Sequence, residues 1–400
     1  MSSSTTIAGS TLRHELNGFD AVRLALAYAV ATNGMVITPF IVSAIMLRFH
    51  LNESASTQVV GIEILGLALS CAFLPRWITR VARTFSMVGV LGTIAAQALS
   101  AVASTVTLMS VARGMAGLFE GMLFVVVASG ISHRAGADRL WGLVNLLAGG
   151  INGSILVVAS FLPEAWLGRW LFLLLVGLTA VMAPMIVGIH HFAARHHGPH
   201  AHASLKPPVK LVLAIWVITV LIYGAQASQW AVAGFVGTHS AGLSSSTIGI
   251  LLSVSSLLGF AGAIIPAQRA SQAHRLKLIW LAQLVMIGAT IEFFRSTSGM
   301  SYFLSQLILN CAFFVVIPFL TGLLSEIDLD GSLVARTVVV TFIGAAAGTA
   351  MAGGLFSCYG GQHFSYALGI GVALAFPFVL MALNGASRHS AVGPAHQLSS

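Results

Sequence analysis

Long apolar runs, each close to the length of a membrane-spanning helix, divide the chain from one end to the other. A spanning helix needs about 20 predominantly apolar residues. The runs of the first half cover 21–47, 55–75, 84–104, 107–132, 139–162 and 168–190. Those of the second half cover 209–236, 245–266, 275–294, 299–324, 333–357 and 362–384. The pattern predicts an all-α polytopic membrane protein with 12 transmembrane helices in two six-helix bundles.

The polar segments between and around these runs set the predicted domain boundaries. Residues 1–20 form an N-terminal tail, 21–190 the first bundle, 191–208 a linker that contains His and Pro, 209–385 the second bundle, and 386–400 a C-terminal tail. Ala72–Pro75 ends the second run and Ala263–Pro266 ends the eighth, and basic residues follow both. Such internal repetition predicts that the two bundles are pseudo-symmetric.

Composition supports the membrane assignment. Of the 400 residues, 57% are hydrophobic and only 8% are charged, against about 25% charged in an ordinary soluble domain. The net charge of +8 comes from short basic clusters between the runs rather than from a continuous stripe. These clusters indicate membrane topology and not nucleic-acid binding.

The basic residues also predict an orientation. If the N-terminus is cytoplasmic, fifteen of the 19 Lys and Arg lie on the inner side, whereas only Arg48, Arg169 and Arg295 lie on the outer side. The remaining one, Arg113, lies inside a run. By the positive-inside rule both termini and the linker face the cytoplasm. We therefore expect a multi-pass protein of the cell membrane, of the bacterial inner membrane type, with the lipid bilayer as its surroundings.

With these features the chain resembles the major facilitator superfamily of transporters. The similarity rests on six plus six spans, a central linker and basic loops after the second and eighth spans, and on the stretch from Arg113 to Gly117, which fits an Arg-x-x-x-Gly pattern in span 4. The resemblance implies a central cavity lined mainly by spans 1, 4, 7 and 10. It also marks Arg76, Arg80 and Arg83 as a candidate gating loop, although the Asp usual in that loop is missing.

Three ionisable residues within the predicted spans are candidates for chemistry, because a charge at membrane depth is costly and usually functional or paired. Glu63 and Arg113 lie at similar depths, so they could form an ion pair, which could be purely structural. Glu120 has no basic residue within one helical turn. Burial favours the neutral form of such a carboxyl. We therefore predict that Glu120, and with it Glu63, carries the coupling proton.

Arg113 is also the first candidate for substrate binding, because a guanidinium matches a carboxylate. Uncharged candidates follow from the spans expected to line the cavity. They are Asn33, Asn145, Gln226, Trp230 and Asn310. The four amides among them could instead serve helix packing, and Trp230 could stack on a substrate.

These observations predict a secondary active transporter of a small organic solute, coupled to protons, which could take up an organic or aromatic acid. The alternative is proton-driven efflux of amphipathic or cationic compounds. A membrane enzyme is a rival of another class, but the spans contain no central His and no DxxD cluster. No nucleotide-binding motif is present. We expect no cofactor, no metal and a functional monomer, although the histidines of the linker could in principle bind a metal.

Overall fold

The computed structural model describes residues 18–132, 137–193, 209–268, 271, 273–327 and 332–384, and all regular structure within them is helical. The first half contains seven α-helices and two short 3-10 helices. They are α1 (Gly18–Val36), α2 (Thr38–Phe49), α3 (Glu53–Phe73), η1 (Pro75–Trp77), α4 (Ile78–Val102), α5 (Val106–Ser132), α6 (Ala137–Ser160), α7 (Glu164–Ile186) and η2 (Val187–Phe192).

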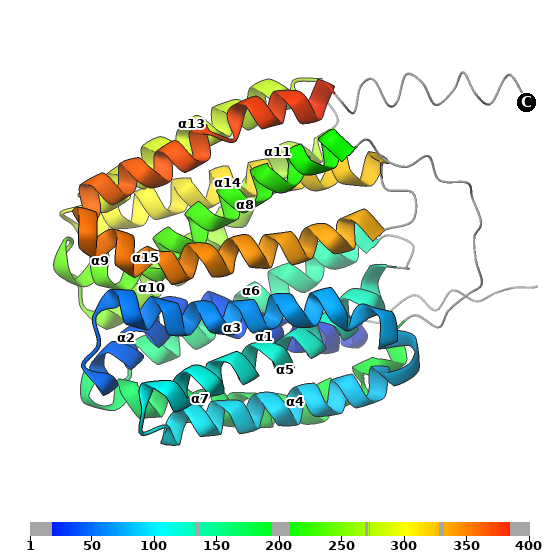
Figure 1. The fold of residues 1–400 in the computed structure, drawn as a ribbon, viewed down its shortest axis with the longest axis vertical. Coiled ribbons are helices and arrows are strands. Elements are labelled where there is room, and N and C mark those ends of the chain that lie inside the picture. The colour runs from blue at the N-terminus through cyan, green and yellow to red at the C-terminus, as the bar shows by residue number, and fades with distance from the viewer. Residues whose placement is uncertain are drawn as a thin grey trace, which may run out of the picture.

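The second half begins at Val209. Its helices are α8 (Val209–Ala231), α9 (Ala233–His239), α10 (Ser245–Gly259), η3 (Phe260–Ala263), α11 (Ile264–Ala267), α13 (Arg275–Arg295), α14 (Gly299–Ile327) and α15 (Ser332–Ala373). In Figure 1 the blue-to-teal helices of the first half fill the lower part of the molecule, and the green-to-red helices of the second half fill the upper part.

Local sequence accounts for where the helices start and bend. The Asn52 side chain caps α3 by accepting a hydrogen bond from the Ala55 amide at 2.9 Å, and Ser244 caps α10. Such caps satisfy amides that have no partner within the helix. Pro39 lies in the first turn of α2, which bends away from α1 by 51°. Proline is tolerated at a helix start but breaks a continuous helix, so the predicted first span is a bent pair.

Ten of the described helices are long and apolar enough to cross a membrane, or eleven when α1 and α2 count as one span. The last runs from Leu333 to Asn384, 52 residues, which is about 78 Å at 1.5 Å per residue. A bilayer core is about 30 Å thick. Gly360, with φ 70° and ψ 163°, interrupts this helix, and Figure 1 shows the chain reversing from orange to red. The stretch is therefore too long for a single crossing and is divided near Gly360.

The two ends of the bundle differ in how the halves pack. We call the end where η2 stops and α8 starts the linker side, and the opposite end the far side. At the far side one hydrophobic core joins both halves and includes Ile41, Phe172, Val236 and Tyr302. At the linker side the second half has its own core around Ile215 and Leu323, and the core of the first half around Leu24 and Ile131 also takes in Phe342 of α15. The halves therefore share one core at the far side, whereas at the linker side their cores are distinct apart from Phe342.

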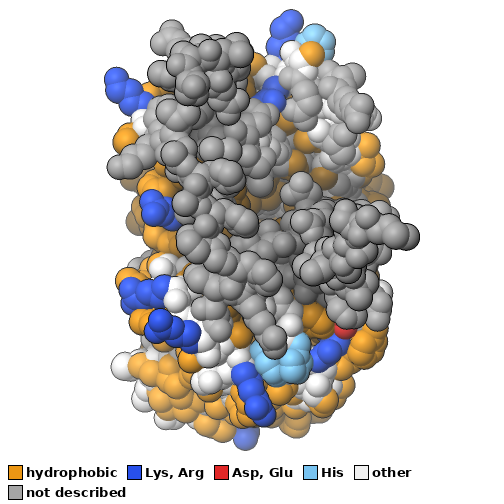
Figure 2. Space-filling view, turned by 90° about the vertical axis from the view of Figure 1, so that its right-hand side faces the viewer, with side chains coloured by type: hydrophobic (Ala, Val, Ile, Leu, Met, Phe, Trp, Pro, Cys, Tyr) orange, Lys and Arg blue, Asp and Glu red, His pale blue; other side chains and the backbone are white. Residues whose placement is uncertain are grey.

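The linker side is also the basic side. Figure 2 looks onto it and shows Lys and Arg side chains around its rim. The described Lys and Arg at helix ends on this side outnumber Arg48, Arg169 and Arg295 at the far side. They are Arg23, Arg76, Arg80, Arg83, Lys210, Arg275, Lys277 and Arg336.

Candidate functional site

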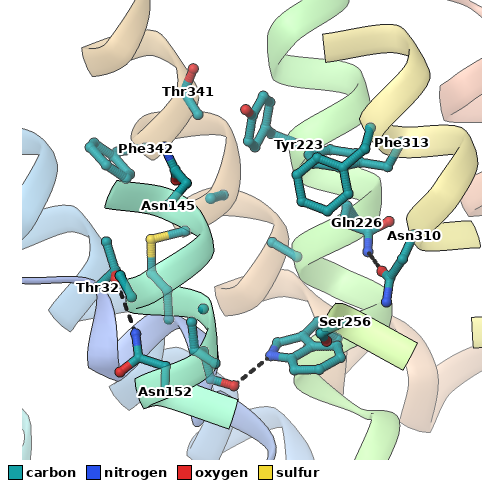
Figure 3. A pocket seen from close by; sticks show the side chains of 18 of the residues that line it. Thr32, Asn145, Asn152, Tyr223, Gln226, Ser256, Asn310, Phe313, Thr341 and Phe342 are labelled. Carbon is teal, nitrogen blue, oxygen red and sulfur yellow. Dashed lines mark hydrogen bonds between the residues drawn. The ribbon is translucent and has the colours of Figure 1, made fainter. Parts of the chain in front are cut away.

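A cavity of about 440 Å³ lies between the two halves. Figure 3 shows Thr32, Asn145 and Asn152 of the first half across from Tyr223 and Gln226 of the second. On the second half its wall continues along α14 and α15 to Leu324 and Val334, close to the linker side. Volumes of roughly 300–1,000 Å³ are typical of small-molecule sites. The cavity has the size, and the position between two bundles, of a solute site.

Aromatic rings form much of the cavity wall. Tyr223 and Phe313 meet edge to face with ring centroids 5.1 Å apart. Phe124 of the first half and Phe342 of the second meet in the same way at 5.1 Å. Tyr28 lies 5.7 Å from Phe124, measured between ring centroids. Rings in this arrangement present both faces and edges to a ligand.

Uncharged amides supply the hydrogen-bonding groups. Asn152 Nδ2 donates to Thr32 Oγ1 at 3.2 Å within the first half. In the second half Asn310 Oδ1 accepts from Gln226 Nε2 at 3.1 Å and from Gln306 Nε2 at 3.2 Å. Behind the wall, Gln229 Nε2 donates to Gln306 Oε1 at 2.7 Å. The second half thus carries a chain of four linked amides, of which Gln226 and Asn310 line the cavity.

The bend in the first span ties the two halves together at the cavity. The Phe40 amide donates to Ile37 O at 2.9 Å, so the Val36 carbonyl loses its usual helical donor, four residues on. The Trp230 indole Nε1 of the second half donates to that carbonyl at 3.0 Å. A backbone group released by the bend is therefore satisfied across the interface, as buried carbonyls require.

Further polar contacts join the halves at or near the far side. Ser253 Oγ donates to Gly153 O at 2.9 Å, and the Gly353 amide donates to Thr57 Oγ1 at 3.1 Å. Together with the shared core, these bonds close the cavity toward the far side.

The charged residues of the first half form a separate cluster. Arg113 Nη1 lies 2.8 Å from Glu63 Oε1, and both side chains are almost completely buried. Arg113 Nη2 donates to Gln97 Oε1 at 2.7 Å, and Nε and Nη2 donate to Ser100 Oγ at 3.2 and 3.1 Å. The guanidinium also lies over the Phe172 ring at 5.1 Å. Its donors are thus engaged by protein groups.

Glu120 is buried within electrostatic reach of Glu63 and Arg113. Its Oε1 atom has no hydrogen-bond partner among the described residues, and the same holds for Glu63 Oε2 and Asn33 Oδ1. The Glu63 carboxyl packs against Gly34 of α1, where any side chain would overlap it. Two carboxyls and one guanidinium thus share a buried region between α1, α3 and α5.

The structure places the predicted residues in two groups. Asn145, Gln226, Trp230 and Asn310 line the cavity. The other predicted site residues within the spans, Arg113, Asn33, Glu63 and Glu120, are buried away from its described lining.

Arg113 therefore has no contact with the cavity in this conformation. The reason is the rotation of α5, which points the guanidinium at α3 and α4. The proposed gating residues Arg76, Arg80 and Arg83 are exposed at the linker side, and Arg76 stacks on Trp77 at 3.9 Å.

Apart from Trp230, sequence reasoning missed the aromatic residues of the cavity wall, and it also missed Thr32, because it gave most weight to amides and charges in the spans. Aromatic residues recur along spans 1, 7, 10 and 11, but helical spacing of this kind is equally typical of a packed core. Among the described residues no group of three or more His, Cys, Asp or Glu could hold a metal. Most of the linker histidines considered above, from His196 to His202, lie outside the described residues.

Solved structures identify the class of fold. The chain matches a D-xylose–proton symporter with a TM-score of 0.69 and 13% identity, over 90% of this chain and 96% of that one. It matches a variant of the nucleoside transporter NupG with a TM-score of 0.68 and 12% identity, over 90% and 98%. It matches the human organic anion transporter MFSD10 (TETRAN) with a TM-score of 0.63 and 13% identity, over 91% and 100%.

The chain therefore has the fold of major facilitator superfamily transporters, and the neighbours named here are transporters rather than enzymes. No protein-family model and no curated sequence matches it.

Proposed function

We propose that this membrane protein is a secondary active transporter that moves a small organic solute by alternating access. One observation carries the proposal: a solute-sized cavity lies between two halves that share one core at the far side and have two largely distinct cores at the linker side. Opening the far side while closing the linker side would expose the same cavity to the opposite face. The fold, which is shared with transporters, supports this interpretation.

Coupling to protons is the second part of the proposal. If Glu63, Glu120 and Arg113 were all ionised, this buried cluster would hold one uncompensated negative charge, which is costly at membrane depth. A proton on Glu120 removes it. The carboxyl lies in α5 near α1, the helix that carries both Thr32 of the cavity and the bend, so protonation could act on the bend. The cell membrane, with the linker side cytoplasmic, is the proposed location.

Alternating access can be tested without knowing the solute. Ser256 lines the cavity, and Ser256→Cys in a background lacking Cys71, Cys311 and Cys358 gives one reporter thiol there. A Cβ at Gly354 would lie 3.9 Å from Ser54 Cβ across the two halves at the far side, close to the mean of about 3.8 Å in disulfides. Ser54→Cys with Gly354→Cys should therefore lock the far side shut.

We expect an impermeant thiol reagent to reach the reporter thiol of Ser256→Cys from both faces of a sealed vesicle. A second variant carries Ser256→Cys together with Ser54→Cys and Gly354→Cys, and this cysteine pair is oxidised to a disulfide before labelling. Labelling from the far side should then stop, while labelling from the linker side continues. Reduction should restore it, and the two single cysteine variants serve as controls. Labelling from one face only, before any oxidation, would contradict alternating access.

Transport itself is tested by counterflow in proteoliposomes with sugars, nucleosides, aromatic acids, aromatic amides and cationic drugs. Flux through this protein should disappear on oxidation of the Ser54→Cys, Gly354→Cys pair and return on reduction. Proton coupling is tested with Glu120→Gln, which imitates the protonated carboxyl. The variant should still exchange solute but should not accumulate it when a pH difference is imposed. Undiminished accumulation would remove Glu120 from the mechanism.

A further inference from the structure

The described wall of the cavity contains no Asp, Glu, Lys, Arg or His. The charged side chains of the spans lie elsewhere in the bundle. The charged cluster of α3 and α5 in the first half turns away from the cavity, and in the second half α8 and α14 carry linked amides instead. A ligand charge placed there would lose hydration without gaining a countercharge, and such an uncompensated buried charge is strongly unfavourable.

Arg113 does not supply that countercharge. Its three nitrogens already bond Glu63, Gln97 and Ser100, and the side chain has no exposed surface. Turning it toward a substrate carboxylate would break these bonds and leave Glu63 unpaired. An anionic solute thus has no anchor in the described wall of the cavity, and a cationic solute has no carboxylate there either.

The uncharged groups instead match a flat, polar but neutral molecule. Tyr28 and Phe124 lie on the first-half wall, and Tyr223 and Phe313 on the second. These rings can stack on a ligand ring. Within the described part of the chain, Gln226 Oε1 and Asn310 Nδ2 have no hydrogen-bond partner. Side-chain amides rotate broadly about their last torsion, so these atoms can accept from and donate to a ligand.

From these observations we propose that the cavity takes uncharged aromatic or heteroaromatic molecules that carry a carboxamide or a similar donor–acceptor group. The inference rests on the proposed function only in taking the cavity as the solute site. It replaces both the organic acid and the cationic compound considered from the sequence.

The test compares three probes with one ring system: 2-naphthamide, 2-naphthoate and 2-naphthylmethylamine. At neutral pH they are neutral, anionic and cationic. Binding is measured by isothermal titration calorimetry to full-length protein in nanodiscs, with the Ser54→Cys, Gly354→Cys pair oxidised. We expect 2-naphthamide to bind at least about tenfold more tightly than either charged probe. Equal or tighter binding of naphthoate or of the amine, or no binding by any of the three, would overturn the proposal.

The site is checked with Gln226→Leu and Asn310→Leu. Each should lower the affinity for 2-naphthamide about fivefold. The affinity for 2-methylnaphthalene, which lacks the amide, should stay almost unchanged. Gln283→Leu is the matched control, since Gln283 is a buried amide of α13 outside the cavity. If Gln283→Leu weakened binding of 2-naphthamide, or if Gln226→Leu and Asn310→Leu left it unchanged, the probe would bind outside this cavity. The locked protein does not have to transport for this binding experiment to work. Binding of 2-naphthamide can therefore be absent while counterflow shows transport, and binding can be present while counterflow shows none.

Discussion

The two halves of the molecule use different chemistry at comparable depths in the membrane. In the first half Arg113 and Glu63 form a buried ion pair that faces away from the cavity. In the second half, α8 and α14 carry amides, of which Gln226 and Asn310 line the cavity. Charge is therefore kept away from the cavity wall, and neutral hydrogen-bonding groups are placed on it. The difference shows that the buried charges of the first half are kept apart from the neutral side chains with which both halves line the cavity.

Arg113→Met should break this contrast most severely. The substitution leaves Glu63 buried without its partner, and the free energy of unfolding should fall by about 3–5 kcal/mol. Thermal unfolding of the purified protein in detergent measures the loss. Adding Glu63→Gln to the same variant should restore part of the stability. Wild-type stability for Arg113→Met alone would mean that the ion pair does not distinguish the first half energetically.

Gly34→Ala should disturb the same pair although it replaces neither charged residue. The added methyl group would overlap the Glu63 carboxyl and push it away from Arg113, with a cost of about 1–3 kcal/mol for overpacking. Gly150→Ala is the control, because no heavy atom lies within 4 Å of the position that its new Cβ would take. That change should be neutral or stabilise α6 by up to about 1 kcal/mol, since Ala favours helix more than Gly. Equal unfolding temperatures for the two variants would argue against a tight contact at Gly34.

Gln306→Leu sharpens the comparison from the other half. It removes the acceptor of Gln229 and one donor to Asn310, yet it leaves no charge behind. The expected loss is about 1.5 kcal/mol, clearly below that of Arg113→Met. The same thermal unfolding assay tests this order. A loss as large as that of Arg113→Met would show that amides and charges contribute alike.

Trp230→Phe should have the smallest effect on stability and a visible effect on conformation. Phe keeps the ring but cannot donate to the Val36 carbonyl, which weakens the join between the halves by about 1 kcal/mol. The far-side-open population should rise about fivefold. The rate at which Ser256→Cys is labelled from the far side reports it. An unchanged rate would mean that this hydrogen bond does not hold the far side closed.

Much of the fold followed from hydropathy alone, whereas the site followed only in part. Segments of apolar residues located the spans, and even the break between 357 and 362 contains Gly360, where the chain turns. Depth along a helix is readable from sequence, so Glu63 and Arg113 could be matched as a pair. The rotation of α5 about its own axis cannot be read from the sequence in the same way, because α5 is apolar on nearly all sides.

For that reason Arg113 looked like a cavity residue and lies outside it, while Asn145 and Gln226 line the wall as expected. The partners Gln97 and Ser100 come from α4, and nothing in their own sequence neighbourhood points to Arg113. The bend at Ile37 could be anticipated from Pro39, but the bond that Trp230 donates there depends on the opposite half.

The single core at the far side has a thermodynamic consequence. To open there, the molecule must separate apolar side chains of both halves, such as Ile41 and Val236, and admit water between them. Exposing apolar surface raises the heat capacity. A van't Hoff plot of the equilibrium constant between the two orientations should therefore be curved rather than straight. The preference for the orientation described here should then be strongest at one particular temperature and weaken on either side of it.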